Sequence, residues 1–290
     1  MIADEACREC SRNKINIYTR LYKAPKQREQ EIIGRAERYL DEEAVGLSAP
    51  RMMAGLLKIL KEETGIKDPY EKIKKDYDLL LLGMEEKIRG NILRSEDPFT
   101  AALQYAIIGN YIDFGAFSEI DEAKLIELLD SYAEIDLDLK ETEYLREELG
   151  RAGRILYITD NAGEIVLDKI CIGILKELYP QLEVTVLVRG IPVLNDATLE
   201  DAELIGLDQI AGVISNGTDI PGTEYDQISE EARACMDSSD LCIAKGQGNF
   251  ESLRECGKNI YYLFLCKCDL FVERFQVERL TPVLRNELRM

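Results

Sequence analysis

The sequence predicts an α/β protein: a Rossmann-like, parallel-rich sheet in three layers, preceded by an all-helical N-terminal domain. Two patterns support this fold class. Up to about residue 150 the apolar residues recur with a helical period, and from about residue 151 short β-rich runs alternate with helical stretches. A chain of 290 residues has room for one large or two medium domains. We therefore expect a helical domain over 1–150 and an α/β domain over 151–290.

The helical half is predicted from spacing and from its boundary residues. Met52, Leu56, Ile59 and Leu60 fall on one face of a helix, and the same spacing recurs between residues 73 and 88. Ser or Asp stands before a nearby Pro at residues 48–50, 68–70 and 97–99, which is typical of helix starts. This half is expected to contain helices only.

The second half contains five apolar runs that we expect to be strands. They cover residues 155–159, 184–188, 212–215, 241–244 and 260–265. Strands that are apolar on both faces belong in a parallel sheet covered by helices on each side. The segments 164–179 and 198–209 have the length and polarity of crossover helices, which completes the three-layer prediction.

The composition limits the kinds of molecule that the protein is expected to bind. The chain carries 36 basic and 55 acidic residues, a net charge of -19, so binding to nucleic acid or to an anionic membrane surface is not expected. The apolar runs are too short to span a bilayer. Eight cysteines are too few for a disulfide scaffold, and the first residues lack an apolar signal core. We expect reduced thiols and a cytoplasmic location.

The chain contains no histidine, which narrows the chemistry. Ser-His-Asp and Cys-His catalysis and histidine-ligated metal sites are excluded. Any reaction must use carboxylates, amides, Lys, Arg or Cys.

Polar residues follow four of the five predicted strands, where parallel α/β sheets bind ligands. They are Asp160, Asn161 and Glu164 after the first strand, Arg189, Asn195 and Asp196 after the second, Asn216 after the third, and Lys245 with Gly246 after the fourth. This convergence predicts one site at the carboxyl edge of the sheet.

Oxygen donors at this edge indicate a divalent cation. Asp160 and Asn161 could provide two ligands and Asp196 a third, a set that suits Mg²⁺ or Mn²⁺. The same residues are also good helix caps and turn formers, an alternative that the spacing leaves open.

Basic residues and glycines at the same edge indicate a phosphate site. Lys245 and the backbone at Gly246 could contact a phosphate, and Arg189 could clamp one, although strand-end cations often simply reach solvent. The segment 246–251 is not a dinucleotide fingerprint, because Glu251 stands where a third glycine is needed, and no P-loop is present.

Two further groups of polar residues leave their roles open. Asn110 and Asp113 interrupt an almost wholly apolar helix, so they either lock it to a neighbouring backbone or line the pocket. Cys7 and Cys10, together with Cys266 and Cys268, could form a four-thiolate zinc site or could be plain thiols.

These segments together resemble the damage-control phosphatase family, also called domain of unknown function eighty-nine. The matching pieces are TDNAGEIVLD at 159–168, VRGIPVLNDATLEDA at 188–202, SNG at 215–217, AKGQGNFESL at 244–253 and DPFTAALQYAIIGNYIDFG at 97–115. They span most of the chain in order. The CxxC start at Cys7 and Cys10 is similar to the archaeal and bacterial branch of that family.

The resemblance implies a helical part packed on a Rossmann-like part and a phosphatase that depends on a divalent metal, with Mn²⁺, Ni²⁺, Co²⁺ or Mg²⁺ supporting activity. By motif position, Asp160, Asn161 and Asp196 would be the metal ligands and Lys245 the phosphate-contacting lysine. We extend this to substrate contacts from Glu164, Arg189, Asn110, Asp113, Asn216 and Gly246.

The leading hypothesis is therefore hydrolysis of small phosphorylated metabolites, such as sugar phosphates or damaged phosphometabolites. The segment after Asp160 lacks the DxD spacing of haloacid-dehalogenase-type phosphatases, which favours water over Asp160 as nucleophile. The alternatives are a Rossmann-like cofactor-dependent transferase and a phospholigand-binding protein that does not turn over. The substrate, the native metal and the oligomeric state do not follow from the sequence.

Overall fold

A six-stranded sheet forms the centre of the molecule. In a computed structural model that describes residues 1–113 and 120–290, the strands lie in the order β3-β2-β1-β4-β5-β6. Their bounds are β1 Arg154–Ile158, β2 Glu183–Val188, β3 Gly212–Ser215, β4 Leu241–Lys245, β5 Ile260–Leu265 and β6 Pro282–Asn286. The first five run parallel, and β6 pairs antiparallel with β5.

The chain reverses its winding direction at β1. Ile158 lies opposite Leu187 of β2 on one side and opposite Ala244 of β4 on the other. Strands β2 and β3 extend the sheet in one direction from β1, and β4 and β5 in the other. Such a switch point leaves a crevice at the carboxyl ends of the two diverging strands, where open α/β sheets bind ligands.

Helices precede the sheet and alternate with its strands. They are α1 Glu5–Leu21, α2 Glu29–Arg38, the π-helix η1 Tyr39–Glu43, α3 Ala49–Thr64, α4 Glu71–Leu82, α5 Glu85–Arg94, α6 Pro98–Gly109, α7 Glu122–Asp130, η2 Tyr132–Glu134, α8 Leu139–Arg151, α9 Glu164–Leu178, α10 Leu199–Leu204, η3 Leu207–Gln209, α11 Glu230–Ser238, α12 Gln247–Leu253, α13 Asp269–Phe275 and η4 Glu287–Arg289. Among the described helices, six begin with an Asp or Ser cap, and two of these caps, Ser48 before α3 and Asp97 before α6, are at predicted starts.

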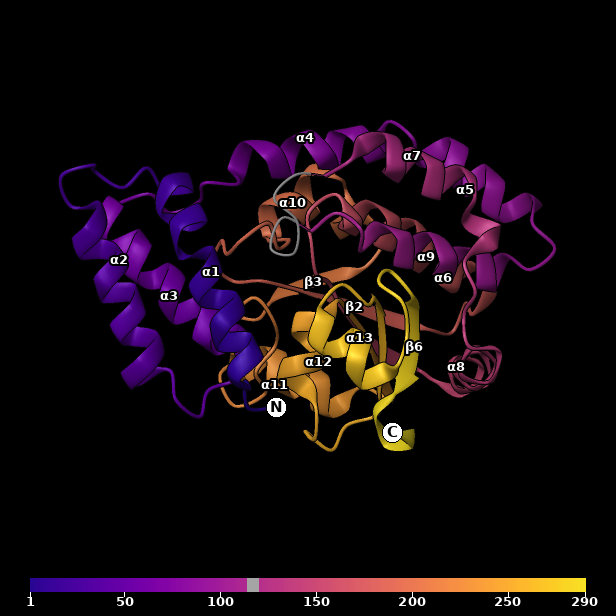
Figure 1. The fold of residues 1–290 in the computed structure, drawn as a ribbon. Coiled ribbons are helices and arrows are strands. Elements are labelled where there is room, and N and C mark those ends of the chain that lie inside the picture. The colour runs from indigo at the N-terminus through magenta and orange to yellow at the C-terminus, as the bar shows by residue number, and fades with distance from the viewer. Residues whose placement is uncertain (114–119) are drawn as a thin grey trace.

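Alternate strand residues pack on opposite faces of the sheet and produce three layers. Ile155 and Tyr157 of β1 belong to a cluster with α6 and α9, while Leu156 and Ile158 belong to another with α11 to α13. Figure 1 shows α4, α6 and α9 on one side of the strands and α11, α12 and α13 on the other. This confirms the predicted α/β, mostly parallel fold.

The first helices have a hydrophobic cluster of their own. It joins α1, α2 and α3 through residues such as Tyr18, Ile32 and Leu57, and Val193 from the loop after β2 enters it. Apolar residues of α4 to α8, such as Leu81, Leu103 and Leu145, by contrast, share the largest cluster with the sheet. A division at residue 150 into two domains stays a prediction, because helices from before that point pack in the same core as the strands.

The five predicted strands and both crossover segments match observed elements, the second of them as α10 followed by η3. Strand β6 was not predicted, since PVLRN alternates only weakly and contains Pro282, a residue confined to strand edges and first positions. No helix among the described residues is long and apolar enough to cross a membrane.

Candidate active site

Two loops meet at the switch point. The first follows β1 and carries Asp160 and Asn161, and the second follows β2 and carries Asp196. They are joined by backbone hydrogen bonds, from Ala162 N–H to the Asn195 carbonyl and from Ala197 N–H to the Asp160 carbonyl, each 2.8 Å. The predicted oxygen donors are thereby brought together on a rigid support.

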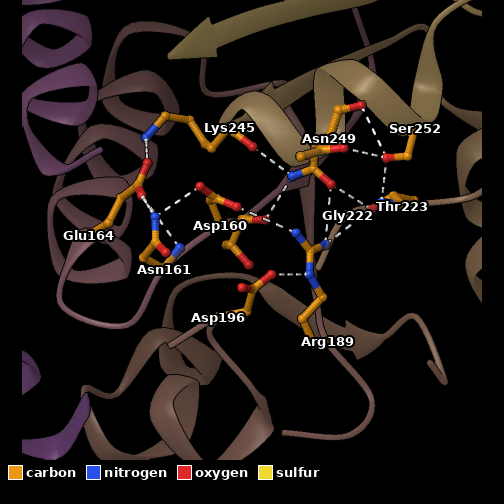
Figure 2. A network of polar contacts seen from close by, with 12 residues as sticks. Asp160, Asn161, Glu164, Arg189, Asp196, Gly222, Thr223, Lys245, Asn249 and Ser252 are labelled. Carbon is orange, nitrogen blue, oxygen red and sulfur yellow. Dashed lines mark hydrogen bonds and ion pairs between the residues drawn. The ribbon is translucent and has the colours of Figure 1, made fainter. Parts of the chain in front are cut away.

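An amide and a carboxylate orient the first loop. The Asn161 Nδ2 group donates to Asp160 Oδ2 and to Glu164 Oε2, both at 2.8 Å. Because its nitrogen is engaged in this way, the carbonyl oxygen of Asn161 is the atom left for a ligand. Figure 2 shows Asp160 between Asn161 and Arg189, with Glu164 on the far side of Asn161.

Asn110, at the end of α6, ties the helical half to this loop. Its Nδ2 donates to Asp160 Oδ2 at 3.1 Å and to Glu164 Oε2 at 3.1 Å, and its Oδ1 accepts from Leu265 N–H at 3.0 Å. Asn110 thus fulfils the first of its two predicted roles: it locks the helix to a neighbouring backbone, and it also braces the site.

Arg189 lies behind the carboxylates instead of facing a substrate. Its Nε donates to Asp196 Oδ2 at 2.6 Å, and Nη1 reaches Thr223 Oγ1 and Asn249 Oδ1 at 3.1 and 3.2 Å. Nη2 lies 3.6 Å from Asp160 Oδ1. The side chain is 1% exposed and does not line the cavity described below, so the geometry favours a positioning role over the predicted substrate contact.

Lys245 is also withdrawn from the surface. Its ammonium donates to Glu164 Oε1 and Asp168 Oδ1, both at 2.7 Å, and to the Ala106 carbonyl at 2.8 Å. An ammonium group has three protons, and these acceptors use all of them. The predicted phosphate contact from Lys245 stays a prediction, and in this arrangement its charge neutralises Glu164 and Asp168.

A cavity of about 590 Å³ opens in front of the loops. Asp160, Asn161 and Asp196 line it together with Asp113 and Lys267. The Lys267 ammonium donates to the Asn110 carbonyl at 2.6 Å and to Asp113 Oδ2 at 2.5 Å, which leaves one proton for a ligand. Asp113 therefore fulfils the second predicted alternative, that of a pocket-lining residue.

Lys267 was missed by the sequence analysis. It stands two residues after the end of β5, so the rule that polar residues after strands form the site applies to it as well. Its flanking cysteines, Cys266 and Cys268, drew the interpretation toward thiol chemistry instead.

Negative charge accumulates where Asp160 and Asp196 line the cavity. Burial, followed by the neighbouring Glu164, Asp196 and Asp113 carboxylates, raises the pKa of Asp160 well above its usual value. Burial raises the pKa of Asp196 to about 6, although Arg189 counteracts the shift. A cation at this position would relieve both effects.

The residues present fit a divalent metal. Asp160, Asn161 and Asp196 offer two carboxylates and an amide oxygen at one end of the cavity, and hard divalent cations prefer such oxygen ligands. Among the described residues, no cluster of three or more Cys, Asp and Glu side chains is placed to hold a metal. The set therefore needs the amide of Asn161 as its third member.

Asn216 and Gly246, which were predicted to contact the substrate, hold the loops around the site in shape. The Asn216 Oδ1 accepts from Gly190 N–H at 3.0 Å and Thr218 N–H at 2.9 Å, so this residue shapes the turn after β3 and does not line the cavity. At Gly246, with a φ of 80°, a Cβ atom would lie 2.0 Å from Asp160 Oδ2. Only glycine lets this backbone approach the carboxylate.

The four-thiolate zinc alternative has no support in the described part of the chain, where no such cluster is formed. Cys7, Cys10 and Cys268 do line the cavity, whereas Cys266 is buried. Burial raises the pKa of the Cys7 thiol to about 12, which keeps it protonated.

The fold and the site define a Rossmann-like α/β protein with a cluster of acid and amide oxygens at its topological switch point. Residues 3–281 match the family model described as "Damage-control phosphatase ARMT1-like domain". The chain belongs to this family, as its motifs indicated.

Relatives and a solved structure agree with this assignment. A damage-control phosphatase of Pyrococcus horikoshii is 36% identical over 219 residues, 74% of this chain and 75% of that protein. One of Archaeoglobus fulgidus is 32% identical over 212 residues, 72% of each chain. An uncharacterized protein of Methanocaldococcus jannaschii is 38% identical over 227 residues, 76% of this chain and 73% of its own.

The structural comparison extends over the whole chain. The crystal structure of a DUF89 family protein from Pyrococcus horikoshii superposes with a TM-score of 0.84 at 28% sequence identity, covering 99% of both chains. Both the family and the fold class predicted from the sequence are confirmed.

Proposed function

We propose that this protein is a divalent-metal-dependent phosphatase that hydrolyses small phosphorylated metabolites and so serves in damage control. The observation that carries the proposal is the convergence of Asp160, Asn161, Asp196 and Lys267 in one cavity at the switch point. The family membership supports a phosphatase. The cavity, at about 590 Å³, has the size of a small-molecule site.

Asp160, Asn161 and Asp196 would hold the cation, which we propose to be Mn²⁺, Ni²⁺, Co²⁺ or Mg²⁺. When bound, such a cation polarises the phosphoryl group and offsets charge that develops during transfer. Arg189 keeps Asp196 oriented through its 2.6 Å contact, and Asn110 does the same for Asp160. Side chains held in this way need no rearrangement during the reaction, which is how preorganised sites lower barriers.

Lys267 is the cation of the chain that we assign to the phosphate. Its free proton faces a cavity lined by oxygen ligands, and a charge-assisted hydrogen bond to a phosphoryl oxygen is the strong kind. Asp113 and the Asn110 carbonyl fix the direction of that ammonium. Positioning and electrostatics of this sort provide most of the catalysis in phosphoryl transfer.

Water is the nucleophile that we propose. Asp160 Oδ2 already accepts from Asn110 and Asn161, so the carboxylate is held as a ligand and not directed as an attacking group. Cys7 and Cys268 have raised pKa values, which makes thiolate attack unfavourable.

The test is release of inorganic phosphate from a panel of sugar phosphates and a chromogenic aryl phosphate. The protein is first stripped with a chelator and then supplied with each of the four cations. Asp160→Asn is expected to lower turnover by about 10³-fold or more, since it removes a ligand charge. Asp208→Asn, which changes an exposed carboxylate outside the cavity, serves as the matched control.

Release that returns with metal and disappears in Asp160→Asn would support the proposal. No release with any cation, combined with tight binding of a sugar phosphate, would contradict it and would favour a binding protein.

A further inference from the structure

A buried carboxyl group of the helical half supports the loop after β1, which carries Asp160 and Asn161. Asp78 of α4 is 0% exposed, and its Oδ1 accepts from the Gly163 N–H at 2.6 Å. Gly163 has a φ of 77°, and a Cβ there would lie 3.0 Å from Tyr77 Cβ. The turn that follows Asn161 is therefore held by a contact that reaches back 85 residues along the chain.

A second buried carboxyl group supports the other loop. Asp201 of α10 accepts from both the N–H and the Oγ1 of Thr198 at 2.7 Å, which forms a capping box two residues after Asp196. The same Oδ2 accepts from the Lys74 ammonium at 3.2 Å. Lys74 also lies 3.3 Å from Asp68 Oδ2, so a single cation already serves two carboxylates.

The two supports face each other. Asp78 Oδ2 is buried and has no donor among the residues that the structure describes. The carboxyl group of Asp201 lies against the same buried face of α4, because Lys74, one turn before Asp78, donates to it at 3.2 Å. The Asp201 carboxylate also contributes to raising the pKa of Asp78. Two ionised carboxylates close together repel strongly in a buried site, and a buried oxygen without a hydrogen-bond donor destabilises the folded state. A proton between the two groups removes both penalties.

We propose that Asp78 and Asp201 share one proton, and that this acid pair fixes the spacing of the two loops that carry Asp160, Asn161 and Asp196. Asp78 is the protonated partner, because Asp201 accepts three hydrogen bonds that require an anion or a lone pair. Asp78 is a positioning residue: it touches neither metal ligand nor cavity. The inference rests on the proposed function only where it concerns turnover.

The charged groups around the pair give the pH dependence its direction. Burial, followed by Asp201, raises the pKa of Asp78 to about 8, while the Gly163 N–H and Lys74 oppose the shift. Because the folded pKa lies above the unfolded one, stability from this group is present below about pH 4 and is lost as the pH rises to about 8. Above that pH, two repelling carboxylates would push the loops apart.

Asp78→Asn is the informative variant. An asparagine can accept from Gly163 with its oxygen and donate to Asp201 with its nitrogen, as the protonated acid does. Wild-type phosphate release is expected to fall about tenfold between about pH 7 and about pH 9, whereas Asp78→Asn stays nearly level. Asp78→Leu, which can neither accept nor donate, is expected to lose both Mn²⁺ affinity and turnover.

The metal-free proteins provide a readout that needs no activity. Melting temperatures of wild type and Asp78→Asn are measured from about pH 5 to about pH 9, and the wild type is expected to show the steeper decline. Asp76→Asn, on the exposed face of the same helix where Asp76 pairs with Lys72, is the matched control and should follow the wild type. Mn²⁺ affinity is measured by calorimetry on the same set.

The outcomes separate the two proposals. If Asp78→Asn loses Mn²⁺ affinity as Asp78→Leu does, or melts with the same pH slope as wild type, the shared proton is wrong. If wild type releases no phosphate with any cation, the proposed function is wrong, and the melting and calorimetry data still decide the acid pair. Asp201→Asn should not mimic Asp78→Asn; equal behaviour of the two would also overturn the assignment of the proton.

Discussion

The floor and the wall of the cavity are built in different ways. The floor consists of the residues at the carboxyl ends of the strands, among them Asp160, Asn161 and Asp196. Its carboxylates accept hydrogen bonds from donors in both halves of the chain. The wall is one face of α1 with the start of α3, and it rests on the separate cluster of the first three helices. The floor and the wall are therefore supported by different hydrophobic clusters.

The wall has a different chemical character from the floor. Cys7, Cys10, Lys14 and Tyr18 recur at helical spacing along α1 and line the cavity, and Met53 of α3 joins them. The wall thus combines thiol, thioether and aromatic groups with the charged and polar side chains of Lys14, Glu9 and Asn13, whereas the floor offers acid and amide oxygens. A substrate would present its phosphate to the floor and the remainder of the molecule to the wall.

Apart from the proposed metal ligands, the largest effects should come from Lys245 and Lys267, which differ in what they contact. Lys267→Met is expected to lower phosphate release about 10²-fold, as loss of one charge-stabilising donor does elsewhere. Its cost in stability should be smaller than that of Lys245→Met, because its partner Asp113 is partly exposed. Lys245→Met would leave Glu164 and Asp168 buried without their cation, which should cost about 3–5 kcal/mol of unfolding free energy. Turnover of the two variants and their urea unfolding are measured in parallel.

The contrast is reversed if Lys245 contacts the phosphate. In that case Lys245→Met would fold normally and lose activity, and Lys267→Met would retain it. Arg254→Met, which removes a partly exposed cation outside the cavity, is the control for the loss of positive charge.

An intermediate effect is expected from a substitution in the hydrophobic cluster that supports the wall. Leu57 of α3 is fully buried in the cluster of the first helices, and Leu57→Ala should cost about 2–5 kcal/mol of unfolding free energy. Because the floor meets that cluster through Val193 and Leu194 of the loop after β2 and not through its polar side chains, KM should rise much more than kcat falls. A fall in kcat comparable to that of Asp160→Asn would show that floor and wall are one unit.

The smallest effect is expected from the thiols of the wall. Cys10→Ser should change phosphate release by less than about twofold, because a serine is close in size and no metal cluster forms around Cys10 in the described residues. Zinc content of the purified protein is measured by elemental analysis. One zinc ion per chain that is lost in Cys10→Ser would restore the four-thiolate alternative.

The floor could be anticipated from the sequence because parallel strands bring their carboxyl ends to a common edge. The positions of β1 to β5, and with them the residues after β1 and β2, follow from apolar runs alone. What could not be anticipated is which cation faces inward: Lys245 ends its strand and Lys267 stands two residues beyond the next one, and only packing decides that α6 and α9 enclose the first.

The acid pair was beyond the sequence for a similar reason. Asp78 falls within the amphipathic pattern of α4, where an acidic residue normally faces water, and its partner Asp201 is 123 residues away. Nothing in the spacing of either residue indicates that helix α4 would turn this carboxyl toward the Gly163 turn. The position of the wall could likewise not be predicted, because a helical period does not indicate where one group of helices packs against another.

Asn110 has a consequence for how the protein is made. Its oxygen accepts from Leu265 N–H and its carbonyl accepts from Lys267, contacts that span 155 and 157 residues. A nascent chain therefore carries Asp160 and Asp196 long before the strand that completes their surroundings has left the ribosome. The hydrogen bonds that hold Asn110 against Asp160 can therefore be completed only after that strand has been made.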